Sequence, residues 1–303
     1  MESVSVVIPL FNKEKHIRCA LESVAAQSYP FFEVLIVDDG STDDGAGIAA
    51  AYPDERFRVI RQSRGGAAAA RNTGIAAARH SLIAFLDADD EWMPDFLDTA
   101  LALHHKWPQA GMLATAYMIE KGGCFRRARL IGVPKDQGLI PNYFRSVLRD
   151  IPVISSAVMI PRGIFDRVGV FEEGAQLGED QDMWCRIALE FPVAYCTRPG
   201  AVYHQDTPNS ICFDISVVEE YPVMHTVGDA IPRNPQRQPY LRKYLCKLRL
   251  DYAVRLIRAA RFAEAAAAIV AAGWRMPAKT IIAVYYLLTV FIKKKIGFMG
   301  SAE

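Results

Sequence analysis

Short apolar runs alternate with helical patterns in the first third of the chain. Four of these runs are short and rich in β-branched or aromatic residues, which predicts buried strands at residues 4–8, 33–37, 57–61 and 82–86. After the first run, Ile17, Leu21 and Val24 recur at the spacing of one helix face. We expect Asn12 to cap this helix and the alanine-rich residues 67–78 to form another. Strands and helices alternating in this way predict βαβ units and a parallel sheet.

The pattern is less regular after the first third. Residues 116–150 contain Gly122–Gly123 and a basic stretch, FRRAR, and we expect a mobile segment there. Further apolar runs predict strands at residues 153–160, 193–196 and 201–204. A helix is expected to open near Asp182. From about residue 213 we expect helices with basic faces at 240–260 and 262–272, followed by an apolar run at 280–292.

A polar cluster follows each of the four predicted parallel strands. These clusters are Phe11–Asn12, Asp38–Asp39, Arg64–Gly65–Gly66 and Asp87–Asp89. Ligands of open α/β sheets bind outside the carboxyl ends of the strands. We therefore expect the four clusters to line one site at the edge of the sheet.

The stretch FLDADDEW packs four acids into five positions directly after an apolar run. Carboxylates that converge are stabilised by a cation, and hard oxygen ligands suit Mg²⁺ or Mn²⁺. Because such ions keep water and substrate phosphate as ligands, this arrangement predicts a metal–diphosphate substrate. We assign only Asp87 and Asp89 to that site. Asp90, Glu91 and Asp95 are better explained as acids at the N-terminus of the next helix.

A glycine-rich loop, SRGGAAAARNTG at residues 63–74, precedes the alanine-rich helix. Its backbone N–H groups and the helix N-terminus could face a phosphate, and Arg71 could reach an anionic ligand. A glycine loop with a surface arginine is the simpler alternative. Neither GxxxxGK nor GxGxxG follows the first strand, so ATPase and NAD-binding functions lose their main support.

Length and cysteine usage place the chain in a broad class. Its 303 residues suffice for one large α/β domain with an appendage. The six cysteines are far apart without a CxxC pair: Cys19, Cys124, Cys185, Cys196, Cys212 and Cys246. This spacing argues against a zinc site or a disulfide framework and is typical of a reducing compartment. The strand-like start of the sequence predicts no signal peptide.

Charge is unevenly distributed, with a net −6 for residues 1–212 and +7 for residues 213–303. This asymmetry indicates either a surface that meets anions or a solvated helix face. The apolar run 280–292 has 13 residues, whereas a bilayer-spanning helix needs roughly 20. It is therefore either a core helix or an interfacial helix that ends at Lys293–Lys295.

Five stretches resemble, in this order and spacing, the inverting family-2 glycosyltransferases with a GT-A fold. They are VSVVIPLFNKEKHIRCALESVAAQSY, EVLIVDDGSTDD, RGGAAAARNTG, FLDADD and GEDQDMWCRIAL. The resemblance covers about residues 3–205, and the succession of VDDGSTD, ARNxG and DAD makes it specific. It implies an α/β fold with a Rossmann-like mixed, mainly parallel sheet flanked by helices, and a C-terminal helical extension. The implied regions are a nucleotide-sugar-binding half at 1–115, an acceptor-binding half at 116–212, and a helical, basic region at 213–303.

The resemblance also implies a binding site for a nucleoside diphosphate sugar, most often a UDP-sugar. The implied donor-binding residues are Pro9, Phe11, Asn12, Asp38, Asp39, Gly65, Gly66, Arg71, Asp87 and Ala88. Phe11 would flank the base, and Asp39 would meet the edge of the base, with Asp38 as the weaker candidate. Asp89 would bind Mn²⁺ or Mg²⁺, with Asp87 contributing to the metal or ribose contacts.

In that family an ED pair carries the catalytic base, which implies Asp180 with Glu179 as its neighbour and Asp182 as the fallback. His204, in the stretch VYHQD, loosely matches a histidine that approaches the phosphates or the metal. An ordinary surface histidine is the alternative for this position.

The implied function is the metal-assisted, single-displacement transfer of a sugar to a hydroxyl of a saccharide or lipid-linked acceptor, in polysaccharide or cell-envelope biosynthesis. One alternative is a nucleotidyltransferase that makes the activated sugar, but its GxGxR signature is missing. The other is a non-catalytic nucleotide-binding relative, against which the intact acids Asp39, Asp87, Asp89 and Asp180 argue. We expect a cytoplasmic protein whose basic C-terminal region is a candidate for peripheral contact with the inner face of the membrane. No nucleic-acid partner is expected, because net charge is near zero and the basic stretch has few aromatic residues.

Overall fold

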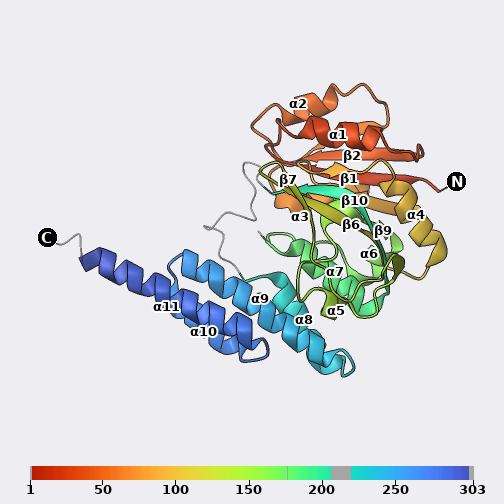
Figure 1. Ribbon diagram of the computed structural model, residues 1–303. Helices are drawn as coiled ribbons and strands as arrows, with labels where there is room; N and C mark the ends of the chain where they lie inside the picture. The colour runs from red at the N-terminus through yellow and green to blue at the C-terminus, as the bar shows by residue number, and fades with distance from the viewer. Residues whose placement is uncertain (1, 176, 206–219, 300–303) are drawn as a thin grey trace. The chain divides into compact units, whose positions relative to one another are not determined.

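The computed structural model describes residues 2–175, 177–205 and 220–299, with side chains up to residue 291 (Figure 1). The chain divides into two compact units, Met1–Ser210 and Ile211–Glu303, which we call unit 1 and unit 2. Unit 1 is a mixed α/β body, and the described part of unit 2 is helical. Cys212 and the side chains of Lys293–Lys295, which the sequence singled out, lie outside the described residues.

Within the described residues of unit 1, ten strands form one sheet. In chain order they are β1 (Val4–Leu10), β2 (Phe32–Asp38), β3 (Phe57–Arg61), β4 (Leu82–Phe85), β5 (Glu91–Trp92), β6 (Met112–Lys121), β7 (Cys124–Arg127), β8 (Gln137–Leu139), β9 (Val158–Pro161) and β10 (Val193–His204). Their spatial order is β3-β2-β1-β4-β9-β6-β10-β5, with β7 on β6 and β8 on β10. The first four run parallel, as do β6 and β10, whereas β9 is antiparallel to β4 and β6. The predicted α/β fold with a mixed, mainly parallel sheet is confirmed.

Alternate residues of the central strands face two layers of helices. On one face, Val6 and Ile8 of β1 belong to a core shared with α1 (Ile17–Ala25), α2 (Gly45–Ala50) and α4 (Phe96–Lys106). On the other face, Val7 lies against Gly74 of α3 (Gly66–Ala77). Figure 1 shows α1 and α2 on one side of β1 and β2. The nearly continuous burial of β1 therefore follows from helices on both faces.

Aromatic side chains attach the later helices of unit 1 to the same sheet. The ring of Phe85 on β4 makes edge contacts with Phe165 of α6 (Gly163–Val168) and with Phe171. Phe171 in turn contacts Trp184 of α7 (Glu179–Glu190) at a centroid distance of 5.8 Å. These contacts hold α7, which carries the predicted catalytic base, against the strand that precedes the acidic cluster.

Two predicted helix starts are wrong. Helix α1 begins at Ile17 with His16 at the N-cap, because Asn12 adopts a positive φ of 50° and its side-chain oxygen accepts the Thr42 N–H at 2.8 Å. Helix α7 begins at Glu179 rather than near Asp182, since Gly178 at its N-cap has a left-handed φ of 80°. Glycine adopts that conformation without steric cost and so ends the preceding loop. Asp180 therefore lies in the first turn of a helix.

Residues 116–150 carry more regular structure than predicted. Strand β6 continues to Lys121, turns through Gly122 and Gly123, and returns as β7. Both glycines have a positive φ, 58° and 78°, which is what a two-residue hairpin turn requires. The glycines thus mark a hairpin turn, and β8 and α5 (Tyr143–Ser146) follow it.

Two other strand predictions also need correction. Of residues 153–160, the first part forms the 3-10 turn η1 (Ser155–Ala157), and only β9 is extended. The strands predicted at 193–196 and 201–204 are one strand, β10, whose pairing with β6 shifts register between Cys196 and Ala201. An irregularity of this kind breaks the alternation of side chains without ending the strand. The sequence pattern therefore predicts two strands where the hydrogen bonds form one.

The described part of unit 2 consists of α8 (Pro222–Arg233), α9 (Gln238–Arg258), α10 (Phe262–Ala272) and α11 (Pro277–Met299). Small apolar clusters around Leu250 and Leu256 join α9 to α10 and α11. The apolar run of α11 is only partly covered: Ala283 is 2% exposed, but Ile282 and Tyr285 are 65% and 71% exposed. None of the helices that the structure describes combines the length and apolar character needed to cross a bilayer.

Candidate active site

The segments that follow β1, β2 and β4 begin at neighbouring positions at the carboxyl ends of these strands. Register pairs Leu10 with Asp38 and Val7 with Phe85. The backbone then continues this adjacency, since the Asp39 N–H donates to the Leu10 carbonyl at 2.9 Å and the Leu86 N–H to the Val7 carbonyl at 3.1 Å. The parallel pairing therefore brings the strand-end clusters around Phe11, Asp39 and Asp87 to one edge of the sheet.

The Asp39 carboxylate anchors the glycine loop. It is 2% exposed and accepts hydrogen bonds from the N–H groups of Gly65 and Gly66, both at 2.7 Å, and from Gln62 Nε2 at 2.8 Å. The two glycine N–H groups, predicted to face a phosphate, are thus directed at this carboxylate. Gly66 has a φ of 90°, a conformation that strongly favours glycine.

The neighbouring predicted donor residues have distinct surroundings. Asp38 is buried, and its carboxylate accepts the Ser41 N–H at 3.0 Å, which shapes the turn after β2. Asn12 is held to the same turn through its contact with Thr42. Pro9 lies within β1, and Ala88 is buried.

Arg64 contacts both groups that the sequence assigned to a nucleotide base. Its Cζ atom lies 3.1 Å from the centroid of the Phe11 ring, and its Nη1 lies 4.0 Å from Asp39 Oδ2. The planar guanidinium therefore stacks on the aromatic ring next to a carboxylate. A flat, hydrogen-bonding ring system would meet the same two partners.

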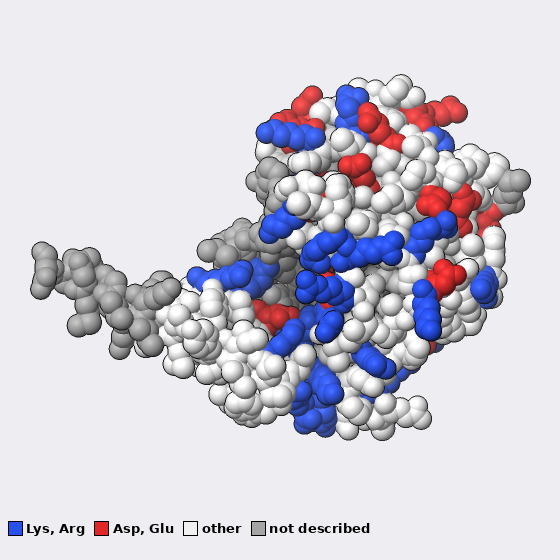
Figure 2. Space-filling view, in the orientation of Figure 1, with Lys and Arg blue, Asp and Glu red and all other residues white. Residues whose placement is uncertain are grey.

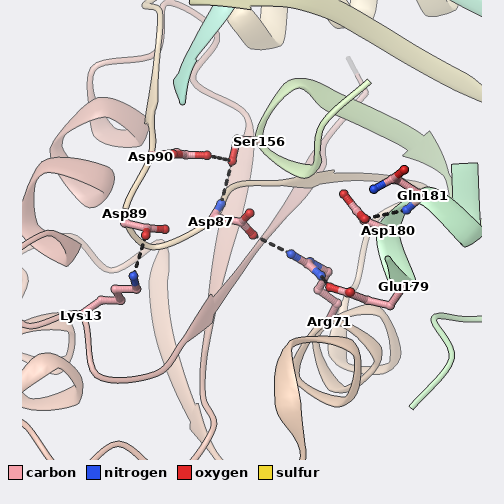
Figure 3. A network of polar contacts seen from close by, with 9 residues as sticks. All are labelled: Lys13, Arg71, Asp87, Asp89, Asp90, Ser156, Glu179, Asp180 and Gln181. Carbon is pink, nitrogen blue, oxygen red and sulfur yellow. Dashed lines mark hydrogen bonds and ion pairs between the residues drawn. The ribbon is translucent and has the colours of Figure 1, made fainter. Parts of the chain in front are cut away.

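Arg71 joins two acidic motifs that are far apart in the sequence. Its Nη2 donates to Asp87 at 2.7 Å and its Nη1 to Glu179 at 2.9 Å (Figure 3). Burial alone would lower the pKa of Arg71, but Asp87 and Glu179 more than offset burial and raise this pKa. The Nε atom of Arg71 is buried without a hydrogen-bond partner in the described part of the structure.

Asp89, the predicted metal ligand, already has a cationic neighbour. Its Oδ2 lies 2.6 Å from the ammonium of Lys13, and both side chains are largely buried. A divalent ion that binds Asp89 would compete with this ammonium; such an ion takes one or two protein ligands and completes its shell with water and phosphate. Asp87, the second predicted ligand, is paired with Arg71. Among the described residues no three His, Cys, Asp or Glu side chains converge into a ready-made metal site.

Asp90 and Glu91 do not start a helix, contrary to the sequence prediction. Asp90 is 1% exposed and accepts hydrogen bonds from the Ser156 hydroxyl and from the His204 N–H. Burial and the neighbouring Asp89 and Asp87 raise the pKa of Asp90 well above its usual value. Glu91 belongs to β5, which pairs with β10, and α4 starts only at Phe96, after Asp95. The hydrogen-bonding needs of a buried acid thus outweigh its preference for a helix terminus.

His204 lies beside Asp89 in a cavity of about 240 Å³ that is also lined by His16 and Glu120. Its ring nitrogens lie 3.2 Å from Glu120 and 3.1 Å from Glu91. The position predicted for a phosphate-approaching histidine is therefore in the neighbourhood of the acidic cluster. Both ring nitrogens, however, already have carboxylate partners.

Asp180 lies next to the Arg71 bridge (Figure 3). Burial and the charge of Glu179 raise the pKa of Asp180 to about 7, although Arg71 lowers it. Asp182, the fallback base, is 1% exposed and pairs with Arg186 at 2.8 Å. A carboxyl group with a pKa near neutrality is suited to accept a proton, which favours Asp180 over Asp182.

The sequence pattern did not predict several residues of this site. Lys13 lies only two positions after Phe11, and this position at the end of the first strand could have indicated that Lys13 belongs to the site. Ser156 accepts the Asp87 N–H at 3.1 Å and donates to Asp90, but nothing in its local sequence indicates this. Arg64 was noted only as part of a glycine loop.

A family model described as Glycosyl transferase family 2 matches residues 5–167. An uncharacterized glycosyltransferase of Rickettsia conorii is 32% identical over 186 residues, which cover 61% of this chain and 30% of the relative. The putative teichuronic acid biosynthesis glycosyltransferase TuaG of Bacillus subtilis is 42% identical over 101 residues, 32% of this chain and 40% of TuaG. The matches thus span well under half the length of these curated relatives.

Two solved structures share the fold. TarS of S. aureus, in complex with UDP-GlcNAc, matches with a TM-score of 0.68 and 17% identity, over 97% of this chain and 92% of that one. The mannosyltransferase PcManGT of Pyrobaculum calidifontis, in complex with GDP-Man and Mn²⁺, matches with a TM-score of 0.59 and 22% identity, over 96% and 86% of the two chains. At these identities the likeness concerns the fold.

Proposed function

The chain belongs to glycosyl transferase family 2, and we propose that it transfers a sugar from a nucleoside diphosphate sugar to an acceptor hydroxyl with inversion. The observation that carries this proposal is the Arg71 bridge. Asp87 of the DAD motif and Glu179 of the GED motif, separated by 92 positions in the sequence, both bind Arg71. One cation thus connects the two motifs that the family uses for donor and base.

Asp180 is the proposed general base. The acceptor hydroxyl gives its proton to the Asp180 carboxylate while its oxygen forms a bond to the anomeric carbon of the sugar. The bond from that carbon to the diphosphate oxygen breaks in the same step, and the diphosphate leaves from the opposite face. A base of this kind typically contributes about 10²- to 10⁴-fold in rate. No enzyme nucleophile takes part.

The leaving diphosphate gains negative charge, and Arg71 is the fixed cation proposed to stabilise it. Its guanidinium is already oriented by Asp87 and Glu179, so little reorganisation is needed during the reaction. Asp89 would hold Mn²⁺ or Mg²⁺, which when bound would neutralise charge on the diphosphate. Lys13 would then keep its place beside Asp89 or turn to a phosphate oxygen.

The base of the donor is proposed to lie on Phe11 beside Asp39, where Arg64 now stacks. Because both partners contact Arg64, donor binding requires this side chain to move. UDP is the favoured nucleotide, since TarS is in complex with UDP-GlcNAc, and GDP is the alternative that PcManGT represents.

The acceptor is proposed to be a saccharide or a lipid-linked saccharide of an envelope polysaccharide, in keeping with the teichuronic acid relative. Peripheral contact with an anionic membrane is proposed for unit 2. Its support is the exposed apolar side chains of Trp274, in the turn between α10 and α11, and of Tyr285 on α11, which are 69% and 71% exposed. The basic charge of residues 213–303 supports it further.

A donor screen tests the function. The purified chain is incubated with UDP-, GDP- and dTDP-sugars and Mn²⁺ or Mg²⁺, and released nucleoside diphosphate is measured. We expect release from one UDP-sugar that depends on the metal. Asp180→Asn should bind that donor normally but transfer no sugar, whereas Glu190→Gln, on the exposed end of the same helix, should remain active. Release from none of the donors, or full activity of Asp180→Asn, would contradict the proposal.

A further inference from the structure

Five exposed arginines gather in the part of unit 1 that follows β6. We call Arg126, Arg127, Arg129, Arg145 and Arg149 the arginine patch; all five are exposed. Figure 2 shows that Lys and Arg side chains predominate over Asp and Glu side chains across the middle of this view. Within residues 121–149, Asp136 is the single acid.

Contacts between neighbouring segments make the patch compact. Asp150 accepts the Arg129 N–H at 2.7 Å and lies 3.5 Å from the Arg126 guanidinium. The Gly132 carbonyl accepts a hydrogen bond from the Ser146 hydroxyl at 3.3 Å, which places the chain after Arg129 against α5. These contacts place the chain around Arg126 and Arg129 near the segment that carries Arg145 and Arg149.

Among the residues that the structure describes, most of this charge has no acidic partner. Arg126 pairs with Asp150, but Arg127, Arg129, Arg145 and Arg149 have no ion pair among the described residues. Charged residues on an edge strand such as β7 can serve only to prevent strand pairing. That role does not explain Arg145 and Arg149, which lie on and after a helix.

Tyr117 connects the segment that follows the patch with β6. Tyr117 of β6 donates a hydrogen bond to the Ile151 carbonyl at 2.8 Å, next to Asp150. Burial raises the pKa of Tyr117, Asp150 and Asp180 raise this pKa further, and Arg126 lowers it. The Tyr117 hydroxyl thus lies within electrostatic reach of both the patch and Asp180.

Tyr143 provides a second connection, because it lies on α5 two positions before Arg145. It is buried, and Asp180 and Tyr117 are among the groups that contribute to its raised pKa, after burial and Cys185. Asp180 thus acts electrostatically on two tyrosines, of which Tyr117 contacts the residue after Asp150 and Tyr143 lies on the helix that carries Arg145.

We propose that the acceptor is an oxyanion-bearing saccharide, carrying phosphate or carboxylate groups, and that the arginine patch binds these groups while the acceptor hydroxyl reaches Asp180. This inference rests on the proposed glycosyl transfer. Guanidinium groups suit the ligand because their planar donors match the oxygens of phosphates and carboxylates in pairs. Several arginines around one surface fit a ligand with repeated charges better than a single anion.

The test measures binding of three oligosaccharide probes to the full chain: a neutral glucose oligomer, the same oligomer bearing a phosphate, and an oligogalacturonate. We expect both anionic probes to bind more tightly than the neutral one, with affinity that falls as salt rises. Arg127→Gln/Arg145→Gln should weaken anionic binding about tenfold, as the loss of charge-assisted contacts predicts, and leave neutral binding unchanged.

A matched variant, Arg58→Gln/Arg61→Gln, removes two exposed charges from β3 at the other edge of the sheet and should bind all three probes like the wild type.

Equal binding of neutral and anionic probes, or equal losses of binding in the two double variants, would overturn the proposal. So would a patch variant that loses binding to anionic phospholipid vesicles but keeps binding to both anionic oligosaccharides. The donor screen on the same preparations separates this failure from failure of glycosyl transfer, in which the wild type would release no nucleoside diphosphate from any donor.

Discussion

At the scale of single residues, the environment of Asp180 explains how an aspartate can act as a base near neutral pH. Burial and Glu179 raise its pKa to about 7, and Arg71 acts in the opposite direction. A carboxylate with an ordinary pKa would be fully ionised at neutral pH but would be a weaker proton acceptor. Asp182, held by Arg186, cannot exchange roles with it.

The first prediction concerns pH. Asp180 acts in its deprotonated form, so kcat/KM should fall about tenfold per pH unit below a pKa near 7. Removing the Glu179 charge in Glu179→Gln lowers the pKa of Asp180, which should move the acidic limb of the profile to lower pH. The measurement is kcat/KM against pH, with Glu190→Gln as the control. An unshifted limb would show that Glu179 does not set this pKa.

The second prediction concerns Asp89. Asp89→Ala removes the carboxylate that is proposed to hold the metal, and Mn²⁺–UDP should bind about 100-fold more weakly, since metal contacts to phosphate are worth several kcal/mol. Calorimetry measures this directly. Asp98→Ala, an exposed acid of α4, should retain full affinity. Tight binding of Mn²⁺–UDP by Asp89→Ala would remove Asp89 from the metal site.

At the scale of elements, the position of Arg71 depends on close packing between α3 and β1. A Cβ atom at Gly74 would lie 2.3 Å from Val7 Cγ1 and 2.9 Å from Cγ2. The helix can therefore approach the central strand only with glycine at this position. Arg71 lies one turn earlier on the same helix, so the height of α3 above the sheet sets the reach of its guanidinium toward Asp87.

The third prediction follows from this packing. Gly74→Ala should destabilise the chain by about 1–3 kcal/mol because it overpacks the interface between α3 and β1, with a fall of several degrees in Tm. Gly163→Ala is the matched control, since a Cβ at the start of α6 meets open space. Thermal unfolding followed by circular dichroism gives both values. Equal Tm values for the two variants would argue against the close contact.

At the scale of the whole molecule, the two units differ in the kind of surface they expose. The patch on unit 1 is formed by arginines, whereas α10, α11 and the turn between them in unit 2 expose Val270, Trp274, Ile282 and Tyr285. Large apolar side chains on the surface of a helical unit usually mark an interaction site. Together with the basic composition of residues 213–303, these side chains support the proposed contact with an anionic lipid surface.

The fourth prediction tests this membrane contact. The full chain should co-sediment with vesicles rich in phosphatidylglycerol but not with phosphatidylcholine vesicles. The double variant Ile282→Gln/Tyr285→Gln should bind these vesicles at least about tenfold more weakly than the wild type, because two apolar side chains no longer enter the lipid. Val170→Gln, which changes a 46% exposed residue of unit 1, serves as the control. Absence of binding by the full chain would exclude the contact.

Local sequence determined much of unit 1. Apolar runs and the residues that follow them predicted β1 to β4 and the polar clusters at the strand ends, because burial on both faces and strand termination are local properties. The order of VDDGSTD, ARNxG and DAD was sufficient to indicate the family. The pattern failed where structure depends on distant partners, as in β10, whose irregular pairing is held by β6.

The tertiary structure decided how the site is assembled. Lys13 meets Asp89 across 76 positions, and Arg71 meets Glu179 across 108, contacts that no local pattern encodes. It also separated acids that look alike in the sequence. Asp180 and Asp182 lie two positions apart on a helix and therefore point about 200° apart, one beside Arg71 and the other toward Arg186. The role of each carboxyl group depends on its burial and on its partners. Both exist only in the folded chain.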